Sequence, residues 1–117
     1  MSTYVDAPTY SFVAGAALVE NRRVTLNSSG QVVYATNNNI YIGVTEHEAA
    51  SGALVSVRLR FSRIELVTVG AAVAVGGAAY GAANGKMTET AAGNQSGIFM
   101  DVGTADGAQV RMLPTAA

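Results

Sequence analysis

Hydrophobic and polar residues alternate most clearly near the middle of the chain. Within residues 55–61 the odd-numbered positions are Val, Val, Leu and Phe, and Ser56, Arg58 and Arg60 lie between them. A period of two is that of a β-strand with one buried face. The extended pattern resumes at residues 63–67, after an expected bend at Ser62. This part of the chain therefore predicts a half-buried strand followed by a second one.

Two other stretches have the pattern of a β-hairpin, in which short β-prone runs flank a turn. The first is residues 24–34, with an Asn-Ser-Ser-Gly turn at its centre. The second is residues 78–88, whose turn contains Asn84 and Gly85. Asn-Gly favours a tight hairpin because both residues tolerate a positive φ.

The two halves of the chain resemble each other at an offset of 55 residues, which falls to 54 where Gly43 matches Gly97. We infer a duplication in which residues 12–59 correspond to residues 67–113. Some matched positions are glycines that we expect in turns at positive φ, where a side chain would be strained. They are Gly30 and Gly52 in the first half, and Gly85 and Gly107 in the second.

No segment combines a helical period with capping residues, so the predicted fold class is all-β. We expect a compact β-barrel or sandwich of short strands, built from the two pseudo-repeated halves. Residues 1–11 are interpreted as an N-terminal extended arm or a first strand, and residues 12–117 as a single β domain. A chain of 117 residues is long enough for one hydrophobic core but not for two independent ones.

Composition excludes several classes of protein. Charged residues make up 13% of the chain and its net charge is −1, so nothing suggests nucleic-acid binding. The apolar run at residues 67–80 is too short and too rich in glycine to span a bilayer, and the first residues do not form a signal peptide. We therefore expect a soluble protein made in the cytoplasm. Without cysteine there is no disulfide, zinc thiolate or thiol nucleophile.

The residue types needed for catalysis do not occur in a useful pattern. His47 is flanked by Glu46 and Glu48, but in a strand the two carboxylates point away from the histidine, so we expect no metal site. There is no nucleophile-elbow pattern and no phosphate-binding loop. The sequence predicts no enzyme, no catalytic residue and no cofactor.

Two sets of residues are candidates for docking onto another protein. The first lies in the N-terminal segment and consists of Tyr4, Val5, Pro8 and Tyr10. An extended segment with exposed aromatic side chains suits docking, but it is equally a first strand packed on its own core. The second set is Arg58 and Arg60, with Arg22, Arg23 and Arg63 nearby, which either face an acidic partner or form a solvated strand face.

The second half also resembles a known family. Its alanine-rich turn and Tyr80, the hairpin around Asn84-Gly85-Lys86-Met87-Thr88, then Gly97-Ile98 and the closing residues 107–113 follow in one order and spacing. This block is similar to small capsid decoration, or cement, proteins of tailed bacteriophages, and residues 15–59 resemble a degenerate copy. Residues 1–10 carry no signature of that family.

The resemblance implies a virion protein on the outer capsid surface that stabilises the assembled capsid. Its partners would be the lattice of the major capsid protein and other copies of itself, as a homotrimer, with no nucleic acid or membrane involved. Two alternatives from other classes are a head-fibre anchor and a glycan-binding β-module. Exposed aromatic side chains around Tyr34, Tyr41 or Tyr80 would favour the glycan-binding alternative.

Overall fold

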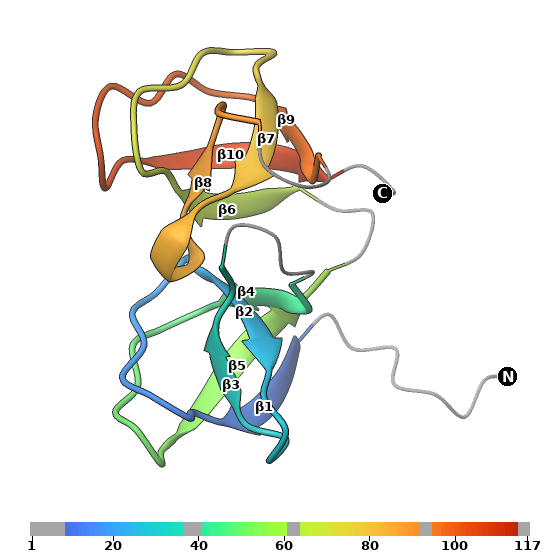
Figure 1. The fold of residues 1–117 in the computed structure, drawn as a ribbon, viewed down its shortest axis with the longest axis vertical. Coiled ribbons are helices and arrows are strands. Elements are labelled where there is room, and N and C mark those ends of the chain that lie inside the picture. The colour runs from blue at the N-terminus through green and yellow to red at the C-terminus, as the bar shows by residue number, and fades with distance from the viewer. Residues whose placement is uncertain (1–8, 37–40, 61–63, 92–94, 115–117) are drawn as a thin grey trace, which may run out of the picture.

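The computed structural model describes residues 9–36, 41–60, 64–91 and 95–114. Within these ranges, every regular element is a β-strand except one short 3₁₀ turn, η1 (Ala83–Gly85). The strands form two curled antiparallel sheets that lie one above the other in Figure 1. The predicted all-β fold of two similar halves is confirmed.

Each sheet has five strands. The first contains, in spatial order, β1 (Thr9–Val13), β5 (Leu54–Leu59), β4 (Gly43–Thr45), β2 (Arg23–Leu26) and β3 (Val32–Tyr34). The second contains β6 (Glu65–Thr68), β10 (Gln109–Pro114), β9 (Gly97–Phe99), β7 (Ala78–Gly81) and β8 (Met87–Thr88). We call residues 9–60 the first lobe and residues 64–114 the second lobe.

The strand order and the register repeat from one lobe to the other. Phe12 of β1 pairs with Val55 of β5, and at the offset of 55 residues Val67 pairs with Val110. Beyond β1, Ala14 forms a parallel bridge to β3, and the residue 55 positions later forms the same bridge to β8. These bridges join the two ends of each sheet, which explains why both sheets curl into small barrels.

Several glycines of the repeat occupy positions that a side chain would disturb. A Cβ added at Gly43 would meet the backbone oxygen of Arg58, and one added at Gly97 would meet that of Leu113. The turn glycines have positive φ values: 77° at Gly30, 88° at Gly52, 72° at Gly85 and 91° at Gly107. Asn84 has a φ of 58°, so both residues of the Asn-Gly turn adopt the conformation that this dipeptide favours.

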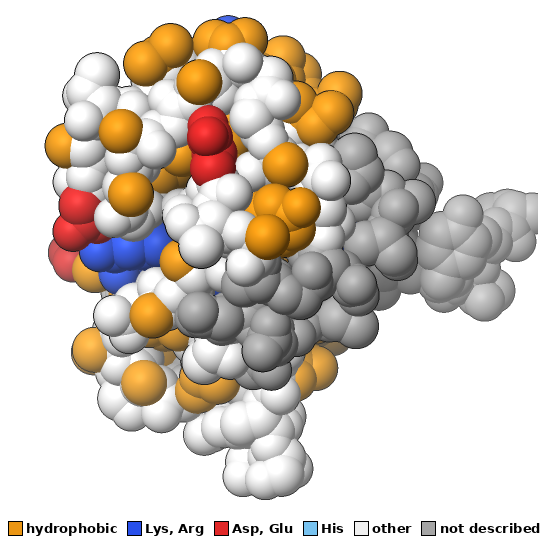
Figure 2. All heavy atoms as spheres, turned by 45° about the horizontal axis from the view of Figure 1, so that its top comes forward, with side chains coloured by type: hydrophobic (Ala, Val, Ile, Leu, Met, Phe, Trp, Pro, Cys, Tyr) orange, Lys and Arg blue, Asp and Glu red, His pale blue; other side chains and the backbone are white. Residues whose placement is uncertain are grey.

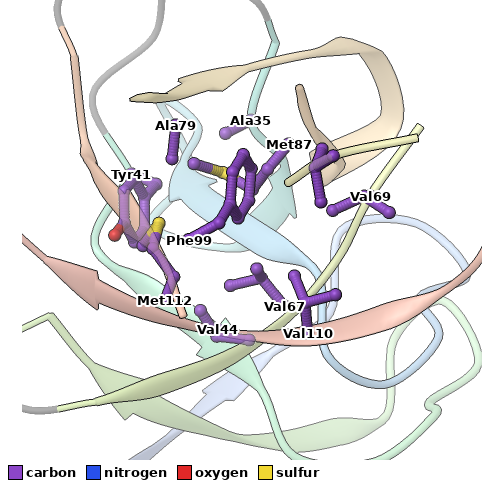
Figure 3. Packing of buried hydrophobic residues seen from close by; sticks show 11 residues of the cluster. Ala35, Tyr41, Val44, Val67, Val69, Ala79, Met87, Phe99, Val110 and Met112 are labelled. Carbon is purple, nitrogen blue, oxygen red and sulfur yellow. The ribbon is translucent and has the colours of Figure 1, made fainter. Parts of the chain in front are cut away.

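The buried hydrophobic side chains of the described residues form two clusters. The smaller cluster lies in the first lobe and includes Val24, Val55 and Val57. The larger lies around Phe99 in the second lobe and takes side chains from the first lobe as well (Figure 3). These are Ala35, Tyr41 and Val44. The two cores are therefore not independent, because the second is completed by the first lobe.

Candidate functional site

No cluster of catalytic or metal-binding side chains was found in the described ranges. They contain no group of three or more His, Asp or Glu side chains placed to hold a metal ion. His47 is exposed, and its Nε2 accepts a hydrogen bond from the backbone N–H of Ser56 at 3.1 Å. No helix in these ranges is long and apolar enough to cross a membrane.

Of the N-terminal docking candidates, Tyr4, Val5 and Pro8 lie outside the described residues. Tyr10 lies on β1, where it pairs with Val57, and its side chain is 49% exposed. Its ring centroid is 5.1 Å from that of Phe12. The chain is thus a regular strand from Thr9 onward, so the end of the proposed arm is already part of the first sheet.

β1 is the terminal strand of the first sheet, and the bridge from Ala14 to Val32 joins its C-terminal end to β3. The backbone N–H of Ala14, just beyond β1, donates to the carbonyl of Ala53 at 2.8 Å. Hydrogen-bonded and non-hydrogen-bonded pairs alternate along an antiparallel ladder. The N–H and C=O groups of Ser11 and Val13 therefore point away from β5, and those of Val13 lie beside β3 at the bridge between Ala14 and Val32.

The side chain of Arg58 turns toward the second lobe. Its Nη2 donates to the side-chain oxygen of Asn21 and to the backbone oxygen of Leu66, both at 3.1 Å. Its Nε lies 3.6 Å from a carboxylate oxygen of Glu65, whose side chain is fully buried. Arg58 therefore contributes to the contact between the lobes.

Arg60 lies two residues after Arg58 and also reaches the second lobe. Its guanidinium lies 4.7 Å from the ring centroid of Tyr41, and its Nη2 donates to the backbone oxygen of Ser96 at 3.4 Å. Burial raises the pKa of the Tyr41 hydroxyl above its ordinary value. The second docking set thus has its charged groups engaged within the molecule.

Arg23, expected only as a neighbour of the docking arginines, is the most deeply buried arginine of this contact. It is 1% exposed, and its guanidinium donates to the backbone oxygens of Ala82 and Lys86 in the second lobe at 2.9 and 3.0 Å. Its guanidinium carbon lies 5.6 Å from the ring centroid of Tyr41. Burial lowers the pKa of Arg23 to about 10.

The feature of the sequence that could have indicated the buried position of Arg23 is Gly81, the residue that it packs against. A Cβ added at Gly81 would lie 2.9 Å from each of the two terminal guanidinium nitrogens of Arg23. Gly81 corresponds to Leu26 in the repeat, so the loss of the side chain in the second half makes room for the arginine. We call the contact formed by Arg23, Arg58, Arg60 and Val44 with the second lobe the junction.

Outside the junction, the described residues of the second lobe form two ion pairs on its surface. The Nζ of Lys86 lies 2.8 Å from Oδ1 of Asp106, and the Nη2 of Arg111 lies 2.8 Å from Oδ1 of Asp101. The hydrogen bonds from Arg111 lower the pKa of Asp101 to about 2. Figure 2 shows one face on which uncharged side chains predominate, with a cluster of basic side chains beside acidic ones at its left edge.

The aromatic side chains considered for glycan binding do not form exposed loop tips. Tyr41 is 2% exposed and lies in the larger core (Figure 3). Tyr34 and Tyr80 are half-buried on β3 and β7, and the hydroxyl of Tyr34 accepts a hydrogen bond from the backbone of Val19 at 2.8 Å. The feature that would favour a glycan-binding module is therefore missing at these three tyrosines.

Comparisons with known proteins agree with the fold and with the resemblance noted in the sequence. The structure is similar to the crystal structure of the head fibre gp8.5 N base of bacteriophage phi29, with a TM-score of 0.78 and 16% sequence identity over 92% of each chain. No curated protein matches the sequence significantly. The family model described as phage cement protein matches residues 5–114. The chain belongs to the phage cement protein family.

Proposed function

We propose that the protein binds the assembled lattice of the major capsid protein from outside and not a free capsid subunit, and that it binds as a homotrimer. The observation that carries the proposal is the family match over residues 5–114. A lattice presents several copies of one site at fixed spacing, and an oligomer that occupies them together gains avidity from effective concentration. On this account it is made in the host cytoplasm, joins the outer capsid surface and has no enzymatic role.

The two-lobe architecture suits such a role. The guanidinium groups of Arg23, Arg58 and Arg60 hold one lobe against the other through hydrogen bonds to backbone oxygens. A rigid two-lobed protein loses little conformational freedom on binding, so more of its contact energy remains for affinity. That property is what a protein needs to hold capsid subunits together.

We place capsid docking in the N-terminal arm, at Tyr4, Val5 and Pro8. Proline keeps a segment extended, and an extended segment can add to the sheet edge of a partner. Arg58 and Arg60 rank below the arm because their guanidinium groups already have partners inside the molecule. Leaving these contacts to bind a capsid would leave polar groups of the junction without partners.

Co-sedimentation with expanded capsids tests the proposal. The full-length protein should sediment with capsids and should bind the isolated capsid subunit far more weakly. A variant lacking residues 1–8 keeps β1 and should lose capsid binding while retaining its fold. Equal binding by this variant would remove the arm from the account, and equal affinity for lattice and free subunit would overturn the lattice proposal.

The base of a head fibre is a second candidate, favoured by the similarity to the head fibre gp8.5 N base of phi29. In that case the protein would bind the capsid and also hold a fibre. Electron microscopy of virions separates the two functions, because a fibre base would be continuous with a projecting fibre and a cement protein would not.

A further inference from the structure

The sheet face that the first lobe turns toward the second lobe has an open counterpart. In the first sheet, Arg58, Val44 and Arg23 form a cross-strand row that lies in the junction. The equivalent row in the second sheet, which we call the head face, consists of Leu113, Ile98 and Ala78. The first two of these side chains are 46% and 38% exposed. The second lobe therefore presents an apolar version of the surface that the first lobe buries.

The first lobe has exposed positions that correspond to buried positions of the second lobe. Three residues of the second lobe are buried, and the residues at the equivalent positions of the first lobe are apolar and exposed. We call these three residues of the first lobe the tail end. Tyr10 stands in the place of Glu65, Val13 in that of Thr68, and Leu26 in that of Gly81. These three side chains are 49%, 37% and 45% exposed.

The residues of the head face and the tail end match each other as the junction residues do. In the junction, Arg58 lies 3.6 Å from the buried carboxylate of Glu65. If the head face of one copy met the tail end of another in the geometry of the junction, Leu113 would take the place of Arg58 and Tyr10 that of Glu65. An ion pair within the chain would correspond to an apolar pair between chains, so both contacts would be chemically matched.

A second pair of positions shows the same complementarity in size. In the junction, the large side chain of Arg23 packs where Gly81 has none. In the equivalent contact, the small side chain of Ala78 would face the large side chain of Leu26. Large and small residues have changed sides, so the volume at the contact is kept.

We infer that copies of this chain associate head to tail, with the head face of one copy receiving the tail end of the next in a repetition of the junction. The junction residues of the first lobe do not correspond to those of the second, so the contact joins two different surfaces. Heterologous contacts form a ring when the rotation from one copy to the next closes, and the proposed homotrimer requires such closure after three copies. The inference rests on the proposed self-association and assigns Tyr10 to the contact between copies, leaving Tyr4, Val5 and Pro8 for the capsid.

A charge exchange at one predicted pair tests this contact. Tyr10→Glu and Leu113→Arg should each weaken self-association by about tenfold or more in analytical ultracentrifugation, because each places an unpaired charge in an apolar contact. The double variant should recover it, because it repeats between copies the pair that Arg58 and Glu65 form within the chain. Val102→Arg, at a position 63% exposed and outside both surfaces, should associate like the unchanged protein.

A crosslink provides a readout that does not depend on tolerance of charge. The chain has no cysteine, so Tyr10→Cys combined with Leu113→Cys introduces its only two thiols. Oxidation should join copies into covalent oligomers linked between positions 10 and 113, whereas Tyr10→Cys with Val102→Cys should give none. Failure of the first pair to crosslink, or association of folded single-charge variants at unchanged strength, would overturn the inference.

The outcomes also separate this inference from the proposed function. If both single-charge variants associate as strongly as the unchanged protein, the homotrimer stands and the head-to-tail contact is excluded. If the protein is a monomer at concentrations that saturate capsids, both the contact and the homotrimer are excluded, but capsid binding is still supported. If the oligomer responds to the charge exchange but does not bind capsids, the proposed function is excluded and the contact is supported.

Discussion

The guanidinium of Arg23 donates to the backbone oxygen of Lys86 in the other lobe, from Nε at 3.2 Å and from Nη2 at 3.0 Å. Arg23→Met removes this donor from the oxygens of Ala82 and Lys86, although the Lys86 oxygen still accepts from the backbone N–H of Ala82. Each buried acceptor left unsatisfied costs about 1–3 kcal/mol. We expect Arg23→Met to lower the free energy of unfolding by about 3 kcal/mol, measured by urea denaturation.

Arg23→Lys is the matched variant for charge. It keeps a cation at the junction but loses the planar fork that reaches two carbonyl oxygens. Its free energy of unfolding should lie between those of the unchanged protein and Arg23→Met. If both variants unfold at the same urea concentration as the unchanged protein, Arg23 does not hold the lobes together.

Equivalent glycines of the two hairpins should differ in their response to alanine. Gly30 and Gly85 both have positive φ, but a Cβ at Gly85 would lie 2.6 Å from the backbone oxygen of Arg23, whereas one at Gly30 would meet nothing within 4 Å. Gly30→Ala should cost about 1 kcal/mol from backbone strain alone. Gly85→Ala should cost about 2–4 kcal/mol, because overpacking adds to that strain. Equal thermal midpoints for the two variants would refute the close approach at Gly85.

The ion pair of Asp101 and Arg111 should give the protein a pH dependence in acid. The pKa of Asp101 is lowered from 3.8 to about 2, so its contribution to stability is present above about pH 4 and is lost as the pH falls toward 2. Asp101→Asn should unfold at a lower temperature at pH 7, and its midpoint should fall less steeply between pH 4 and pH 2. Arg111→Met should flatten the same part of the profile, and an unchanged slope in both variants would exclude this pair as its source.

The sequence predicted the class of fold and its repetition because both depend on local patterns. The period of two at residues 55–61 and the Asn-Gly turn at residues 84–85 are properties of neighbouring residues, and β5 and the β7–β8 hairpin lie there. Gly43 and Gly97 were matched by offset alone, and both turn out to lie against a backbone oxygen. The division of the core between the lobes was not predicted, because the side chains of Val44 and Tyr41, which belong to the first lobe, pack in the larger cluster of the second.

The candidate site was harder to predict because its arginines act across the two lobes. Alternation places Arg58 opposite the core of its own sheet, which is correct, but it does not reveal that the second lobe covers that face. Arg58 pairs with Glu65 in the second lobe, and Glu65 is a buried charged residue at the start of a mostly apolar strand. Contacts between residues far apart in sequence need the relative position of the lobes, which no local pattern contains.

Heat-driven release of DNA from virions tests the central claim, that the protein stabilises the capsid from outside. Particles made without the protein should release their DNA at a lower temperature than complete particles, and adding the purified protein back should restore the higher temperature. Arg23→Lys provides a folded variant with a weakened junction and should restore it only in part. Release at one temperature with and without the protein, from particles that bind it, would contradict the account.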